Sequence, residues 1–225
     1  MRPASLRRPA GATGLAVLGA ALAVPSPARA EEPRWRVEAG LGGSLSFGSA
    51  LRLEQRGQPP IEVDAEWEAR SLEPPLYYGV RVSRDEGGGA WGLRFVHHKI
   101  HLANPTAEVE RFSVSHGYNQ LSLERGFPVR GVKLWLGAGL VVAHPESTVR
   151  GRTGAESGGS LGGGYHLTGP LATIAASRAV PLGRGFALVP EARFTLSRAR
   201  VPIADGEASF PNVALHALVG LELAF

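Results

Sequence analysis

The end of the chain, NVALHALVGLELAF (212–225), alternates between apolar residues and residues that are polar or small. Every second position is apolar: Val213, Leu215, Ala217, Val219, Leu221, Leu223 and Phe225. The positions between them include Asn212, His216, Gly220 and Glu222. Successive side chains of a β-strand point to opposite faces. The pattern therefore predicts a strand with one apolar face.

The same alternation recurs along the chain and predicts an all-β fold of eight strands. The expected strands are 35–54, 61–84 (with an interruption at 71–75), 90–102, 112–124, 132–144, 167–180, 186–199 and 211–225. Connections after the first, third, fifth and seventh strands are longer than the others. This asymmetry is typical of transmembrane β-barrels, in which an even strand number puts both termini on the periplasmic side. We therefore expect an eight-stranded antiparallel up-and-down barrel.

The positions that alternate with the apolar face carry charges of both signs, which decides between a soluble and a membrane barrel. These positions are Arg36, Glu38, Arg81, Arg94, Glu124, Lys133, Glu191, Arg193 and Glu222. Eight strands enclose just enough space for side chains. Ions in that space can pair, and the apolar face then meets lipid. Aromatic residues near strand ends (Trp35, Tyr78, Trp91 and Phe225) fit the girdles of such barrels.

Residues 1–30 have the pattern of a cleavable signal peptide: a basic start, the apolar run 11–24 and the small-residue site Ala28-Arg29-Ala30. We therefore expect two segments, a signal peptide (1–30) and a barrel (31–225). Four of the 24 Lys and Arg residues lie in the first segment, so the barrel has 20 basic and 20 acidic residues. This balance argues against nucleic-acid binding. The chain has no cysteine, which excludes disulfides.

With its signal peptide, strand count and ending LVGLELAF, the chain resembles the small eight-stranded outer-membrane barrels of the OmpA transmembrane domain and OmpW type. The resemblance covers residues 31–225 and implies a place in the cell outer membrane. It implies outer-membrane lipid and lipopolysaccharide as partners. It also implies that the strand ending in Phe225 is read by the barrel-assembly machinery.

The inward charges allow two interpretations. Arg81, Arg94, Glu124, Glu191 and Arg193 are expected to form a paired network. Such a network can simply hold the barrel together, which is the usual reason for clustered ions, or it can mark a binding site. A crowded lumen argues against a wide general porin, which needs more strands.

The stretch FVHHKIHLANPTAEVERFSVSHGYN (95–119) contains four of the seven histidines and is the candidate site. If this hairpin turns around Ala107, His98 lies opposite His116, and directly opposed residues are close enough for two imidazoles to share a metal or a proton. The candidate ligand or active-site residues are His98, His116, Tyr118, Arg94 and Glu124. The candidate ligands of a divalent metal are His98, His116 and Glu73. The alternative interpretation is that these are ordinary interfacial histidines.

The polarity of the two faces switches within this hairpin. Towards its turn the inward side becomes apolar (Ile100, Leu102, Phe112 and Val114) and the outward side becomes polar (Lys99, His101, Ser113 and Ser115). One explanation is that the hairpin rises beyond the membrane, and the other is a β-bulge that exchanges the faces.

The His-rich strand followed by SHGYN (115–119) also bears a similarity to lipid A-modifying barrels of the lipid A oxidase type. The expected function is therefore a small outer-membrane barrel with a structural, ligand-binding or limited transport role. The alternative is an enzyme that modifies lipid A in the outer leaflet.

Overall fold

The computed structural model describes residues 34–154 and 158–225, so the expected signal peptide lies outside the described residues. The described residues form 14 β-strands, all in one antiparallel sheet. No helix in this part of the chain is long and apolar enough to cross a membrane.

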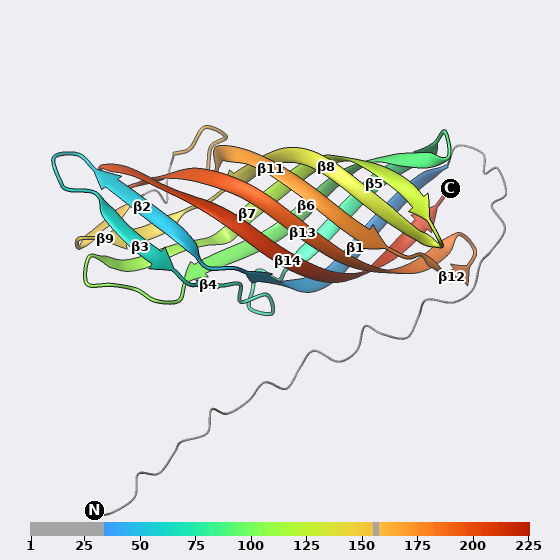
Figure 1. Cartoon of the computed structure of the whole chain (residues 1–225), viewed down its shortest axis with the longest axis horizontal. Coiled ribbons are helices and arrows are strands. Elements are labelled where there is room, and N and C mark those ends of the chain that lie inside the picture. Colours follow the sequence, from blue (N-terminus) through green and yellow to red (C-terminus); the bar gives the residue numbers. More distant parts are fainter. Residues whose placement is uncertain (1–33, 155–157) are drawn as a thin grey trace, which may run out of the picture.

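Eight of the strands close into a ring (Figure 1). They are β1 (Trp35–Ser46), β5 (Tyr78–Glu86), β6 (Gly89–Leu102), β7 (Val109–Val129), β8 (Val132–Ala143), β11 (His166–Ser177), β13 (Phe186–Ile203) and β14 (Gly206–Ala224). The order around the ring is β7-β8-β11-β13-β14-β1-β5-β6, and the pairing of β6 with β7 closes it. The predicted eight-stranded antiparallel barrel is confirmed.

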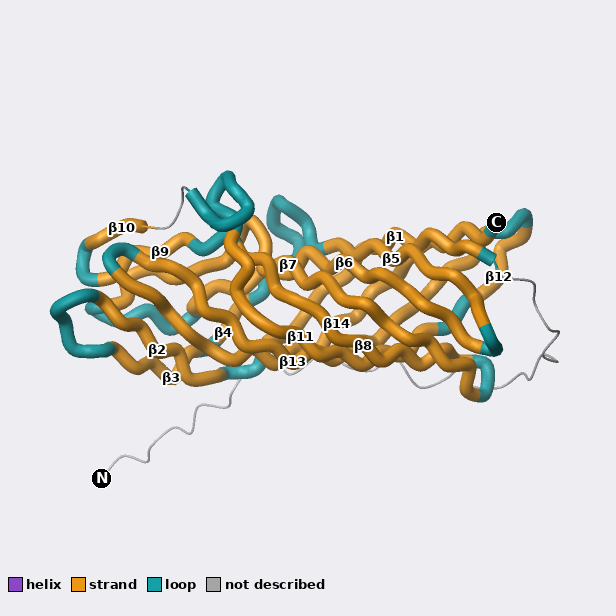
Figure 2. Tube along the Cα trace, turned by 90° about the horizontal axis from the view of Figure 1, so that it is seen from above, coloured by secondary structure: helices purple, strands orange, loops and turns teal. Residues whose placement is uncertain are grey.

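Six shorter strands complete the sheet. They are β2 (Ser49–Gln55), β3 (Ile61–Ala65), β4 (Trp67–Glu68), β9 (Glu146–Val149), β10 (Arg152–Gly154) and β12 (Val180–Gly183). All except β12 lie at the end of the barrel opposite the C-terminus (Figures 1 and 2). There β2 pairs with the start of β14, β4 pairs with the end of β6, and β9 pairs with the start of β7.

Tight turns connect neighbouring strands at the end of the barrel that holds the C-terminus. The two residues between β5 and β6 are Gly87 and Gly88, with φ of 59° and 75°, and those between β7 and β8 are Arg130 and Gly131, with φ of 50° and 82°. Two successive residues with positive φ match the twist of antiparallel strands, which is why glycine is favoured there. At the opposite end the connections are longer, as the sequence predicts, except between β13 and β14. These two strands run to Ile203 and from Gly206, where the sequence predicts a longer loop.

The barrel has two sections with opposite polarity. The proximal section, which holds the C-terminus, consists of β1, β5, β8, β11, β12 and the adjoining parts of β6, β7, β13 and β14. The distal section consists of β2, β3, β4, β9, β10 and the remaining ends of β6, β7, β13 and β14. Its interior is an apolar core that includes Leu51, Leu53, Val63, Trp67, Ile100, Phe112, Val201 and Phe210.

Candidate functional site

The interior of the proximal section is filled by a network of three arginines and three glutamates. Its members are Arg81, Arg94, Arg193, Glu38, Glu124 and Glu191, whose side chains are at most 3% exposed. Glu38 accepts hydrogen bonds from Arg81 (2.9 Å) and Arg94 (2.8 Å). Glu124 binds Arg193 (2.6 Å) and Arg81 (3.2 Å). Each carboxylate thus contacts at least two guanidinium groups, and the charges balance.

This network uses two of the predicted site residues. Arg94 bridges Glu38 and Glu191, and Glu124 bridges Arg81 and Arg193 while accepting a hydrogen bond from Ser122 (3.0 Å). The expected ion pairing inside the barrel is confirmed. Because both groups are buried and paired, neither can reach a lipid substrate outside the barrel.

A second group of ions lies nearer the proximal end. Arg36 binds Asp85 (2.7 Å) and Glu222 (2.8 Å), and Lys133 binds Asp85 (3.0 Å). Beside it, the Arg81 guanidinium lies 4.2 Å from the centre of the Trp135 ring. The predicted inward charges are therefore paired along the depth of the section.

Two buried histidines form the next layer, between the ions and the apolar core. His98 contacts Ser44 through Nδ1 (3.0 Å) and Ser46 through Nε2 (3.2 Å). His216 contacts Tyr77 through Nδ1 (2.9 Å) and Thr195 through Nε2 (2.9 Å). All four ring nitrogens have hydroxyl partners. His98 is fully buried, and its two nitrogens are already engaged, which leaves no position for a metal.

The expected cross-strand pair of His98 and His116 does not form. His98 lies opposite Tyr118, because residues 115–117 of β7 form a bulge opposite Lys99 of β6. The predicted register holds on the distal side of this bulge, where Ile100 lies opposite Val114, and is wrong by two residues on the proximal side. Gly117 has a φ of 130° in the bulge, a backbone conformation that residues other than glycine rarely adopt.

The structure also separates the other predicted residues. The Tyr118 hydroxyl is buried against Ser197 Oγ (2.9 Å). Glu73 is exposed in the connection between β4 and β5, where its backbone oxygen accepts a hydrogen bond from Lys99 Nζ (2.7 Å). The three predicted metal ligands, His98, His116 and Glu73, are thus not brought together.

The bulge is present but does not exchange the two faces, because Val96 and Tyr118 on its proximal side and Ile100 and Val114 on its distal side are all buried. That the hairpin rises beyond the membrane stays a prediction. Ile100, Phe112 and Val114 belong to the distal core. The expected exposure of Lys99 and Ser113 is wrong, because both are buried. Lys99 is covered as its ammonium group binds the connection that contains Glu73.

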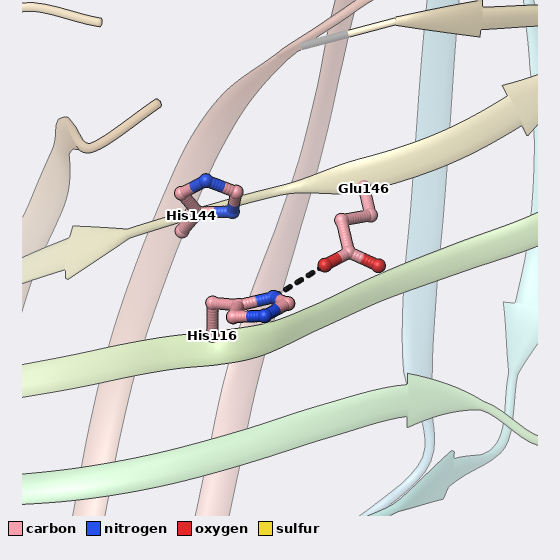
Figure 3. A group of neighbouring side chains, drawn as sticks. All are labelled: His116, His144 and Glu146. Carbon is pink, nitrogen blue, oxygen red and sulfur yellow. Dashed lines mark hydrogen bonds and ion pairs between the residues drawn. The ribbon is translucent and has the colours of Figure 1, made fainter. Parts of the chain in front are cut away.

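The bulge creates a different cluster, formed by His116, His144 and Glu146 (Figure 3). His116 comes from β7, His144 from the two-residue step between β8 and β9, and Glu146 from the start of β9. One ligand atom from each residue lies within 4.8 Å of the others. His116 Nδ1 is 2.5 Å from Glu146 Oε1, and the two imidazole centres are 5.2 Å apart.

Backbone and side-chain contacts fix this cluster, which we call the rim cluster. The backbone N–H of His144 donates to the carbonyl oxygen of Gly117 (3.1 Å). The Tyr165 hydroxyl donates to the carbonyl oxygen of His116 (3.1 Å), and its ring packs edge-on against His144 at 5.1 Å. Arg111 forms an ion pair with Glu146. These contacts hold two strands and the 158–165 connection around the cluster.

The three residues of the rim cluster differ in burial. The side chain of His116 is 59% exposed, that of Glu146 is 7% exposed, and His144 is intermediate. The Nδ1 atom of His144 is shielded from solvent and has no hydrogen-bond partner among the described residues. The cluster thus combines a ring open to the outside with a buried carboxylate and a sheltered ring nitrogen.

Sequence reasoning identified only one member of this cluster, His116. The others belong to AHPE (143–146), at the distal end of a predicted strand. Alternation alone gives no reason to bring them beside His116, because that requires the extra residues of the bulge. Gly117 within SHGYN was the available signal, since an isolated glycine inside a strand often marks a bulge.

Among known proteins, similarity to this chain was found only in solved structures. No family model matches the chain, and no curated protein matches it. The crystal structure of Ail, the attachment invasion locus protein of Yersinia pestis, has a TM-score of 0.40 at 11% identity and covers 87% of this chain and 100% of its own. The solid-state NMR structure of the outer membrane protein AlkL has a TM-score of 0.42 at 12% identity, over 90% of this chain and 96% of its own.

Neisserial surface protein A has a TM-score of 0.34 at 8% identity, covering 82% of this chain and 95% of its own. All three are small outer-membrane β-barrels. The similarity of the His-rich hairpin to lipid A-modifying barrels stays a prediction.

Proposed function

We propose that this chain is a closed, non-conducting barrel of the outer membrane that acts by binding at the cell surface through its distal section. The membrane placement is supported by β13, whose exposed face is apolar or proline from Phe186 to Leu196 and then carries Arg198 and Arg200. The first part is about 11 residues long, which matches the roughly 9–11 residues of a membrane-spanning β-strand.

The observation that carries the non-conducting assignment is the continuous filling of the barrel. From the proximal end, the interior passes from paired ions through the hydroxyl-bound His98 and His216 to the apolar core around Phe210. Eight strands leave an interior just wide enough for side chains. These layers therefore offer no water-filled path along the axis, and transport through the barrel is not favoured.

The distal section has the distribution of apolar and charged residues that is typical of a water-soluble protein. Its interior is apolar, and the β2–β3 hairpin carries exposed charges on its outer side. Arg52 binds Glu54 on the same strand and Glu62 across the hairpin, each at 2.7 Å. Strands β13 and β14, 18 and 19 residues long, extend well beyond the length that a membrane requires. The proposal places this charged, rigid section outside the cell, where it can bind a partner.

The absence of cysteine allows a direct test of this orientation. We would introduce Gln58→Cys at the tip of the β2–β3 hairpin or Arg184→Cys in the turn before β13. A membrane-impermeant maleimide should label Gln58→Cys in intact cells and Arg184→Cys only after the outer membrane is permeabilised. Labelling of both variants in intact cells, or of neither, would contradict the proposed orientation.

Planar-bilayer recording of the purified protein tests the closed barrel. We expect no discrete conductance steps from protein whose gel mobility changes on boiling, as a folded barrel requires. Reproducible steps from such protein would contradict a non-conducting barrel while leaving the membrane placement intact.

Lipid A modification is the second hypothesis, and the geometry does not favour it because His98 and His116 are apart. Mass spectrometry of lipid A from cells with and without the gene tests it.

Interaction with the barrel-assembly machinery is a separate proposal, supported by the exposed side chain of Phe225 and its backbone pairing with Trp35. Replacing Phe225 with Ala should lower the yield of assembled barrel in cells.

A further inference from the structure

We propose that the rim cluster of His116, His144 and Glu146 is a binding site for a single divalent transition-metal cation such as Zn²⁺ or Cu²⁺. The site goes beyond the proposed function and does not depend on it. It shares only His116 with the metal site that the sequence suggested.

The donor chemistry suits this class of cation. Two imidazoles and one carboxylate are the protein ligands of several zinc sites that keep a fourth position open. Imidazole favours Zn²⁺, Cu²⁺ and Ni²⁺ over Ca²⁺ or Mg²⁺, which prefer oxygen ligands. The set therefore favours a transition metal.

The spacing of the ligand atoms is close to that of a bound site. Metal–ligand bonds of about 2.0–2.2 Å place tetrahedral ligands about 3.4 Å apart. In the rim cluster the ligand atoms already lie within 4.8 Å of one another. The side chain of His116 is 59% exposed, so small rotations of this ring can close the remaining distance.

A second observation also indicates a ligand. The Nδ1 atom of His144 is shielded from solvent and lacks a partner among the described residues. A buried polar atom without a partner is unfavourable, and a bound water or ion is one reason why a native structure keeps one. A cation bound by the His144 ring would account for a polar group held in this sheltered position.

The surroundings support the carboxylate as a ligand. Arg111 pairs with Oε2 of Glu146, while Oε1 faces His116. A neighbouring cation favours the ionised form of a carboxylate, which is the form that binds metal. Arg111 also orients the group, and such outer contacts commonly tune metal sites. A metal would replace the proton that His116 and Glu146 share.

The competing explanation is that His116 and Glu146 form only a structural hydrogen bond. The two explanations differ in whether His144 is needed, because a hydrogen bond between His116 and Glu146 forms without it. Metal binding needs all three residues. The experiment therefore compares His144→Ala with variants of the other two.

We would titrate the full-length protein, folded in detergent and carrying no histidine tag, with Zn²⁺ in competition with a chromogenic chelator. We expect one Zn²⁺ per chain. His116→Ala, His144→Ala and Glu146→Gln should each weaken binding by at least about tenfold, since even outer contacts of metal sites contribute 10–100-fold. His166→Ala is the matched control, a histidine close to His144 but outside the ligand set, and should leave the affinity unchanged.

Cu²⁺ provides a readout that a structural hydrogen bond would not give. Nitrogen hyperfine splitting in the electron paramagnetic resonance spectrum should show two imidazole nitrogens in the wild type and one in His144→Ala. Heat-dependent gel mobility would verify that each variant is folded. Wild-type protein that binds no tighter than folded His144→Ala, or an equal loss in His166→Ala, would overturn the proposal.

Discussion

Strand β13 passes through both sections of the barrel, and its two faces exchange character along the way. In the proximal section its exposed face carries Phe194 and Leu196, while its buried face carries Glu191 and Arg193. In the distal section the exposed face carries Arg200, and the buried face carries Ala199, Val201 and Ile203. One strand thus combines the pattern of a membrane barrel with that of a water-soluble protein.

The difference teaches that burial means different things in the two sections. In water, apolar side chains are driven inside, as in the distal core. In lipid, apolar side chains gain nothing by moving inside, so they can stay on the outer face and leave the interior to ions that pair with one another. A charge is tolerated on the outside of one section and on the inside of the other.

The largest effect is expected from breaking the ion network of the proximal section. Arg193→Ala removes contacts to Glu124 and Glu191 and leaves both carboxylates under-compensated. Loss of one partner in a buried ion network costs about 3–5 kcal/mol. The free energy of unfolding in urea, measured in lipid vesicles, should fall by this amount.

Arg200→Ala on the same strand is the control for this change. Arg200 binds Glu207 at 3.4 Å, and both side chains are largely exposed. An exposed pair is worth about 0–1 kcal/mol. If both variants lower the free energy of unfolding equally, the buried ion network contributes no more to stability than an exposed ion pair.

The distal section should respond instead to loss of apolar volume. Leu53→Ala opens a cavity in the apolar core beneath β2 and should destabilise this section by about 2–5 kcal/mol. Limited proteolysis should then cleave the distal section faster, while the heat-dependent gel mobility of the barrel remains. Glu54→Ala, on the exposed face of the same strand, should change neither measurement. Loss of the mobility shift in Leu53→Ala would indicate that the two sections unfold as one unit.

Introducing an arginine on the outer face tests whether that face contacts lipid or water. Val219→Arg places a charge near the middle of the apolar band on β14 and should cost about 2–4 kcal/mol in vesicles. Asp64→Arg, on the exposed side of β3, should remain within about 0.5 kcal/mol of the wild type. If Val219→Arg is equally harmless, the outer face of the proximal section does not meet lipid.

Much of the fold could be predicted from the sequence because its signals are local. Alternation in segments such as 212–225 and 186–199 predicts strands. Charges of both signs at the positions that alternate with the apolar face predict paired ions in the interior, such as Glu191 and Arg193. The change of polarity at Arg198 marks where β13 leaves the apolar band. These inferences need no knowledge of the exact register.

The candidate site could not be predicted because it depends on register. Counting from a turn at Ala107 assumes an unbroken ladder, and the bulge at 115–117 shifts every pair on its proximal side. His98 consequently meets Tyr118, and His116 meets residues that follow β8. A single residue, Gly117, carries the sequence signal for this change.

Gly117→Ala tests the contribution of the bulge and has the smallest expected effect. A residue with a side chain is strained at φ 130°, and its Cβ would lie 2.3 Å from the side-chain Nδ2 of Asn119. Such strain costs about 1–3 kcal/mol, so the unfolding midpoint in urea should fall modestly. Gly43→Ala is the control, because its Cβ would meet only Ser71 at an ordinary 3.5 Å. Equal stability of the two variants would mean that the bulge accommodates a side chain at this position without strain.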